Sequence, residues 1–196
     1  MSFTPAKWPR ELRSQSWYRG TSRDTIYHRG WMKNQGYPDD LFDGRPIIGI
    51  MNTWSDLTPC NGHLRELAEK VKAGIWEAGG FPVEVPAFSA SENTFRPTAM
   101  MFRNLAAMSI EEQMRGQPID GAVLLVGCDK TTPSLMMAAA STDLPSIVVT
   151  GGPMLNGQFR GERVGSGTHL WKFSEAVKAG EMTQEEFLEA EQSMSR

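Results

Sequence analysis

The sequence predicts an α/β fold in which a parallel sheet is flanked by helices. From Pro46 onward, short apolar runs alternate with longer helical patterns, as in strands joined by helical crossovers. With 196 residues, 40% of them hydrophobic, the chain is long enough to bury one substantial core. We therefore expect an irregular N-terminal arm with short helical pieces over residues 1–44 and one α/β domain over residues 45–196.

Four apolar runs have the length and the flanking residues of buried strands. They cover residues 47–51, 81–87, 122–126 and 145–150. The helix that the sequence defines best spans residues 64–78, because its apolar residues recur on one face and Gly79-Gly80 follows them. These runs and this helix are the main support for the α/β prediction.

Weaker local signals predict further helices in the middle of the chain. One helix is expected to begin near Pro97, and Ser109 with Glu112 has the capping-box spacing of another, shorter one. A small Met-rich helix is expected over residues 134–141, and its Met136 and Met137 are assigned to the core.

The last part of the chain is expected to be helical after a Gly-rich stretch over residues 156–168. Two amphipathic helices follow. The second is expected to start at Thr183, because Glu186 stands three residues later in capping-box spacing.

Charge and composition exclude several classes of partner. The net charge is -3, from 20 Lys+Arg against 23 Asp+Glu, and no long basic run occurs, which argues against nucleic acid or a membrane surface. No apolar stretch approaches the roughly 20 residues of a membrane span, and the N-terminus lacks the apolar core of a secretory signal. We therefore expect a cytoplasmic protein whose two cysteines are reduced.

Unusual residues follow each predicted strand, where ligands gather in open α/β sheets. Cys60 follows the first strand, Glu92 the second and Cys128-Asp129-Lys130 the third, while Gly151-Gly152 follows the fourth. Thiolates suit iron-sulfur clusters or zinc, and carboxylates suit Mg²⁺. A soft and a hard site side by side could hold one substrate between two Lewis acids, which indicates dehydration rather than electron transfer.

Each of these residues also has a simpler interpretation. A single free cysteine is most often a core residue, and Asp129 could cap the following helix. Glu92 and Lys130 could be solvated charges, and His63 and His169 receive no role. It is the convergence of the loops on one sheet edge that favours chemistry.

At these residues the sequence resembles the dehydratase family that includes dihydroxy-acid dehydratase and 6-phosphogluconate dehydratase. The resemblance covers about residues 41–157 and rests on the stretches Thr58-Pro59-Cys60-Asn61, Gly127-Cys128-Asp129-Lys130-Thr131-Thr132-Pro133 and Val148-Val149-Thr150-Gly151-Gly152-Pro153-Met154. The segments 91–98 and 16–20 are similar to the pentonate and aldonate branch of this family.

The resemblance implies a hydro-lyase that converts a sugar acid such as L-arabinonate into a 2-keto-3-deoxy acid. It implies that Cys60 and Cys128 bind an iron-sulfur cluster, with [2Fe-2S] favoured and [4Fe-4S] possible. Glu92 and Asp129 would bind Mg²⁺. Lys130 would act as a catalytic residue and a further Mg²⁺ ligand after carbamylation, which requires a neutral amine.

Family members are much longer, so the resemblance implies that this chain is the N-terminal part of a larger two-domain subunit. A cluster normally uses more than two protein thiolates. We therefore expect the chain alone to be inactive and the complete protein to be a homo-oligomer, either a dimer or a tetramer.

Two other functions remain open. One is dihydroxy-acid dehydratase activity in branched-chain amino-acid synthesis, although Arg96 and its polar neighbours suit a longer hydroxylated substrate better. The other is a non-catalytic α/β module with structural cysteines, although no second Cys-x-x-Cys or His pair is present for a closed zinc site.

Overall fold

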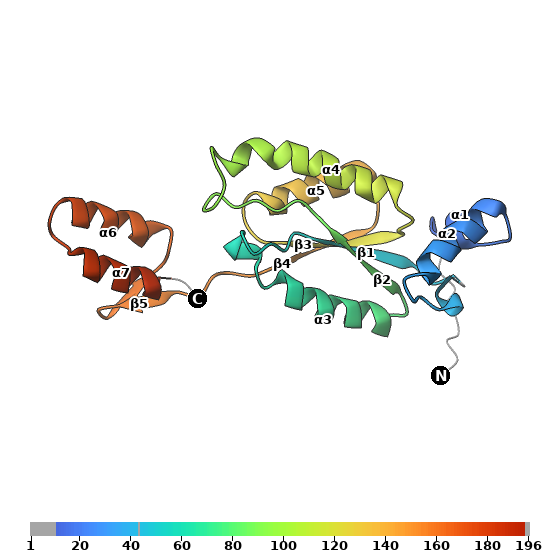
Figure 1. Ribbon diagram of the computed structural model, residues 1–196, viewed down its shortest axis with the longest axis horizontal. Helices are drawn as coiled ribbons and strands as arrows, with labels where there is room; N and C mark the ends of the chain where they lie inside the picture. Colours follow the sequence, from blue (N-terminus) through green and yellow to red (C-terminus); the bar gives the residue numbers. More distant parts are fainter. Residues whose placement is uncertain (1–10, 43, 195–196) are drawn as a thin grey trace. The chain divides into compact units, whose positions relative to one another are not determined.

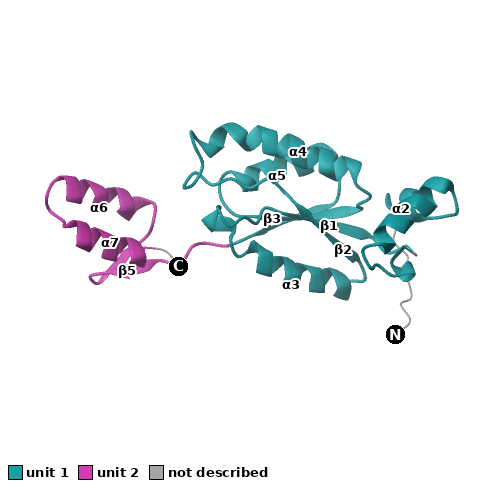
Figure 2. Ribbon diagram, in the orientation of Figure 1, with its two compact units in different colours: residues 1–151 teal, residues 152–196 magenta. Residues whose placement is uncertain are grey.

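A computed structural model describes residues 11–42 and 44–194. The chain divides into two compact units at the bond between Gly151 and Gly152 (Figure 2). The α/β domain expected over residues 45–196 therefore contains the sheet in the first unit and a smaller second unit. None of the helices among the described residues is long and apolar enough to cross a membrane.

The first unit is built on a four-stranded parallel sheet, as the sequence predicts. Its strands lie in the order β2-β1-β3-β4. They are β1 (Ile47–Asn52), β2 (Phe81–Pro86), β3 (Gly121–Val126) and β4 (Ser146–Thr150). The chain moves from β1 outward to β2, then crosses to the other side of β1 for β3 and β4. The carboxyl ends of β1 and β3 thus lie side by side where the winding direction changes.

Helices cover both faces of this sheet. The helix α3 (Leu64–Glu77) lies on one face, and α4 (Arg103–Gly116) and α5 (Thr131–Thr142) lie on the other (Figure 1). The strand β3 is buried along its whole length, which is typical of a central parallel strand.

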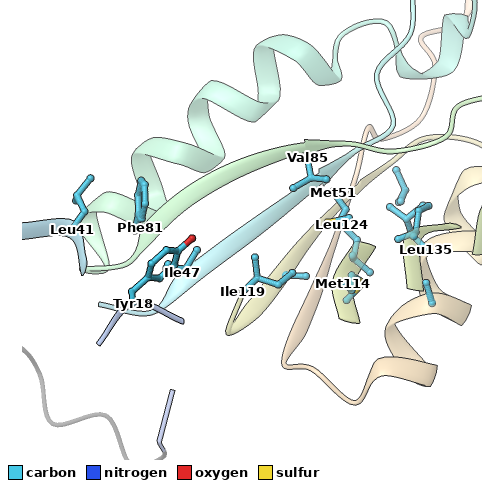
Figure 3. Packing of buried hydrophobic residues seen from close by; sticks show 14 of the residues in the cluster. Tyr18, Leu41, Ile47, Met51, Phe81, Val85, Met114, Ile119, Leu124 and Leu135 are labelled. Carbon is cyan, nitrogen blue, oxygen red and sulfur yellow. The ribbon is translucent and has the colours of Figure 1, made fainter. Parts of the chain in front are cut away.

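Two apolar clusters hold the layers together. On the α3 face, Ile50, Val123 and Leu125 pack with the helix. On the other face, Met51 and Leu124 pack with residues of α4 and α5 (Figure 3). The side chains of alternate strand residues therefore enter opposite clusters.

The described part of the N-terminal arm contains α1 (Gln15–Tyr18), α2 (Arg23–Lys33) and the 3₁₀ helix η1 (Asp39–Phe42). Residues 1–10 and 43, also part of the predicted arm, lie outside the described residues. Asp120 fixes the arm to the sheet, because its carboxylate accepts hydrogen bonds from Ser14 N at 2.8 Å and Ile47 N at 2.7 Å.

Two expectations for the helices on this face are corrected, and the helix expected to begin near Pro97 is confirmed. Ser109 does not start a helix, because it lies inside the continuous α4, whose buried stripe runs through Ala106, Ile110 and Met114. The turn after Pro97 is a 3₁₀ helix, η3 (Ala99–Phe102), that leads into α4. Finally, Met136 and Met137 are not in the core; they are 52% and 43% exposed.

The second unit has its own core and four elements. These are the antiparallel strands β5 (Gly157–Phe159) and β6 (Glu162–Val164), followed by α6 (Thr168–Lys178) and α7 (Gln184–Ser193). The two helices and the capping box at Thr183 are confirmed. The hairpin lies in the Gly-rich stretch for which the sequence predicted no structure.

Candidate functional site

Two sheet loops bring the cysteines together. Cys60 lies in a short 3₁₀ helix, η2 (Pro59–Asn61), in the loop after β1, and Cys128 lies two residues after the end of β3. Because β1 and β3 are neighbours, both loops leave the same edge of the sheet. This is the topological switch point, where α/β proteins bind their ligands.

The two thiols are neighbours. Burial raises the pKa of the Cys60 thiol, and the charge and hydrogen bonding of the Cys128 side chain raise it further. The Cys128 thiol also points to the carbonyl oxygen of Ala90, in the loop after β2, at 3.9 Å. Both cysteines are free and partly exposed, so neither is a sealed core residue.

The carboxylates of Glu92 and Asp129 converge on Lys130. The Lys130 ammonium lies 2.8 Å from Asp129 Oδ2 and 3.5 Å from Glu92 Oε2. Hydrogen bonds from the Thr98 side chain and from Ala99 N, together with Lys130, lower the pKa of Glu92. The ammonium thus marks a position where two negative charges attract a cation.

Simpler interpretations of these residues fail at two positions. Asp129 does not cap α5; the N-cap position is Lys130, and no side-chain cap bond is present there. Lys130 is buried rather than solvated. Glu92 is exposed, as the simpler interpretation expects, and its carboxylate accepts a hydrogen bond from Ala99 N at 3.0 Å.

Lys130 is protonated, whereas carbamylation would require a neutral amine. The hydrogen bond to Asp129, assisted by the charges of Asp129 and Glu92, raises the pKa of Lys130 above its ordinary value. In this arrangement the side chain is an ammonium ion that neutralises the two carboxylates. A bound divalent cation would have to replace that positive charge before the amine could act as a ligand.

The donor set fits the two expected cofactors in kind. Two adjacent thiols suit an iron-sulfur cluster, and two carboxylates around a positive charge suit Mg²⁺. Among residues 11–42 and 44–194, however, no group of three or more His, Cys, Asp and Glu side chains could hold a metal ion by itself. Each pair would therefore supply part of a ligand set.

Two features of the site carried no clear signal in the sequence. The buried amide of Asn61 joins the loops around the thiols, although Asn is common in loops of any kind. His63, which received no role, places its Nε2 3.0 Å from the carbonyl oxygen of Gly151 and so connects the start of α3 to the loop after β4.

Residues 45–196 match the family model described as dihydroxy-acid/6-phosphogluconate dehydratase N-terminal. The chain therefore belongs to the dihydroxy-acid/6-phosphogluconate dehydratase family.

Three relatives illustrate the similarity. The chain is 85% identical to the L-arabinonate dehydratase of Rhizobium leguminosarum bv. trifolii (strain WSM2304), over 97% of this chain and 33% of that protein. It is 62% identical to the L-arabonate dehydratase of Azospirillum brasilense, over 94% of this chain and 32% of that protein. It is 38% identical to the dihydroxy-acid dehydratase of Methanothermobacter thermautotrophicus (strain ATCC 29096 / DSM 1053 / JCM 10044 / NBRC 100330 / Delta H), over 92% of this chain and 33% of that protein. The chain thus spans about a third of the length of these relatives.

Proposed function

We propose that this protein is a hydro-lyase that removes water from a sugar acid, with L-arabinonate as the preferred substrate. The observation that carries the proposal is the convergence of a thiol pair and a carboxylate pair on one edge of the sheet, at the adjacent residues Cys128 and Asp129. The 85% identity to an L-arabinonate dehydratase supports the choice of substrate.

In this proposal, Cys60 and Cys128 hold part of an iron-sulfur cluster, and Glu92 and Asp129 hold part of a Mg²⁺ site. When bound, the two cofactors would supply Lewis acidity to the substrate. Lys130 keeps the carboxylates in place as an ammonium ion until the cation binds. Carbamylation would require Lys130 to lose its ammonium proton, after which the neutral amine would add CO₂ and release a second proton.

The loop after β2 supports a hydroxylated substrate. Residues Glu92, Asn93, Thr94, Phe95, Arg96 and Pro97 line an open hollow of about 870 Å³. The polar groups of this loop, including the exposed Arg96, can donate and accept hydrogen bonds along a polyol chain. A branched alkyl chain cannot form such hydrogen bonds along its length, so these groups favour the hydroxylated substrate.

The test compares turnover by the anaerobically purified full-length protein on L-arabinonate and on 2,3-dihydroxyisovalerate. We expect kcat/KM to be at least about 100-fold higher for L-arabinonate, because sites built for hydroxyl groups discriminate strongly against analogues that lack them. A higher kcat/KM for 2,3-dihydroxyisovalerate would instead show that the protein is a dihydroxy-acid dehydratase. Turnover of neither substrate would favour a non-catalytic module.

A further inference from the structure

A buried polar network joins the loops that carry the thiols. Asn61 is completely buried, and its Nδ2 faces Thr53 O and Thr53 Oγ1, both at 2.9 Å, Ser89 Oγ at 3.3 Å and Thr131 Oγ1 at 3.5 Å. These partners come from the loop after β1, the loop after β2 and the start of α5. One amide group therefore connects three loops at the carboxyl edge of the sheet.

The oxygen of the same amide faces Gly127. A Cβ atom at Gly127 would lie 1.6 Å from Asn61 Oδ1 and 2.9 Å from the carbonyl oxygen of Cys60, so only glycine fits at this crossing. Gly127 N also donates a hydrogen bond to Thr131 Oγ1 at 3.1 Å. The backbones of the two thiol loops are thus in direct contact.

This contact between Asn61 and Gly127 involves the chain neighbours of both cysteines, since Asn61 follows Cys60 and Gly127 precedes Cys128. We propose that Asn61 and Gly127 are positioning residues that fix the separation of the Cys60 and Cys128 sulfur atoms. This inference rests on the proposed function, in which the two thiols bind one cluster and must be held at a set separation before it binds.

The unpaired oxygen of Asn61 favours positioning over stability alone. Among the described residues, Asn61 Oδ1 has no hydrogen-bond partner, although it is buried. An unsatisfied buried oxygen is destabilising, and an apolar residue would avoid that cost. The amide is therefore better explained by the hydrogen bonds that its two N–H groups donate to the surrounding loops and by the close fit of its oxygen against Gly127.

The experiment uses the metal-free full-length protein and two thiol reagents. Phenylarsine oxide binds tightly only where one arsenic atom can bridge two thiols, whereas iodoacetamide alkylates each thiol separately. Gly127→Ala should push the loops apart and lower the affinity for phenylarsine oxide at least tenfold, with alkylation rates within about twofold of the unmodified protein. Gly62→Ala is the matched control, because the nearest atom to its Cβ would be Pro59 O at 3.7 Å.

A second pair of variants covers the case in which Gly127→Ala does not fold, as judged by circular dichroism. Thr131→Val removes the hydroxyl group that contacts both Gly127 N and Asn61 Nδ2, and Thr131→Ser retains it. We expect the valine variant to lose affinity for phenylarsine oxide and the serine variant to keep it.

A folded Gly127→Ala or Thr131→Val variant that binds phenylarsine oxide as tightly as the unmodified protein would overturn the proposal. Neither iron content nor turnover enters this measurement. Its result is therefore separate from that of the substrate comparison, and a protein without dehydratase activity could still show the positioning effect.

Discussion

Lys130 sets the charge balance of the carboxylate pair. Its ammonium group satisfies Asp129 and Glu92 in the metal-free protein, and both carboxylates raise the pKa of the lysine. Removal of either acid would leave the lysine with a single acidic partner. The same removal would deprive a divalent cation of one of its two acidic ligands.

This arrangement predicts that Glu92→Gln and Asp129→Asn each weaken Mg²⁺ binding by at least tenfold, about 1.4 kcal/mol. The glutamine retains an oxygen that can accept the hydrogen bond from Ala99 N, so the loop should keep its conformation. Isothermal titration calorimetry with MgCl₂ on the full-length protein measures the effect. Glu112→Gln, at an exposed position of α4, serves as the control. Equal Mg²⁺ affinities in all variants would show that Mg²⁺ does not bind to Glu92 and Asp129.

At the scale of single elements, α7 shows how local chemistry fixes a helix start. Thr183 Oγ1 accepts a hydrogen bond from Glu186 N at 3.2 Å, and Glu186 Oε2 accepts one from Thr183 N at 2.8 Å. Arg160, in the turn of the β5–β6 hairpin, pairs with the same carboxylate at 2.5 Å. The backbone of Thr183 and the Arg160 guanidinium lower the pKa of Glu186 from 4.5 to about 2.

Because the pKa of Glu186 is lower in the folded state, its charge stabilises the second unit above pH 4.5, and this stabilisation is lost as the pH falls toward about 2. NMR titration of the Glu186 side chain should give a midpoint near pH 2. Glu186→Gln should remove this contribution to the acid dependence of stability, whereas Glu185→Gln should keep it. A midpoint near the ordinary value of 4.5 would show that the capping box does not hold the carboxylate in solution.

Elements with a strong local pattern could be predicted from the sequence. The strands, α3 and the capping box at Thr183 each depend on residues close together in the chain. The predicted start at Ser109 was wrong, because a capping-box spacing also occurs inside helices whose backbone is already hydrogen-bonded. The β5–β6 hairpin was missed because its strands have three residues each and its turn uses Arg160-Gly161, both with positive φ, rather than the more typical Asn-Gly.

The candidate site was predictable only in outline. The rule that parallel strands end at one edge placed Cys60 and Cys128 there, and the structure makes their thiols neighbours. The contact between Asn61 and Gly127 could not be predicted, because it depends on how closely two loops distant in sequence approach each other. The raised pKa of Lys130 likewise depends on the positions of two carboxylates in space.

At the scale of the whole molecule, the loops after β1, β2 and β3 bring a thiol pair and a carboxylate pair to one edge of the sheet, but within residues 11–42 and 44–194 neither pair completes a metal site. The edge strand β4 is largely exposed, with Ile147 60% accessible. Parallel sheets are normally covered on both faces. The chain spans about a third of the length of its relatives, and β4 is the strand of the sheet with the most open surface in this part of the protein.

The central claim is that Cys60 and Cys128 bind one iron-sulfur cluster. Its most direct test is the iron and sulfide content, with the visible absorbance spectrum, of the full-length protein purified without oxygen. We predict a brown protein whose colour and iron are lost in both Cys60→Ser and Cys128→Ser, while Gly62→Ala retains them. A protein that contains no iron, or whose two serine variants keep their colour, would contradict the account.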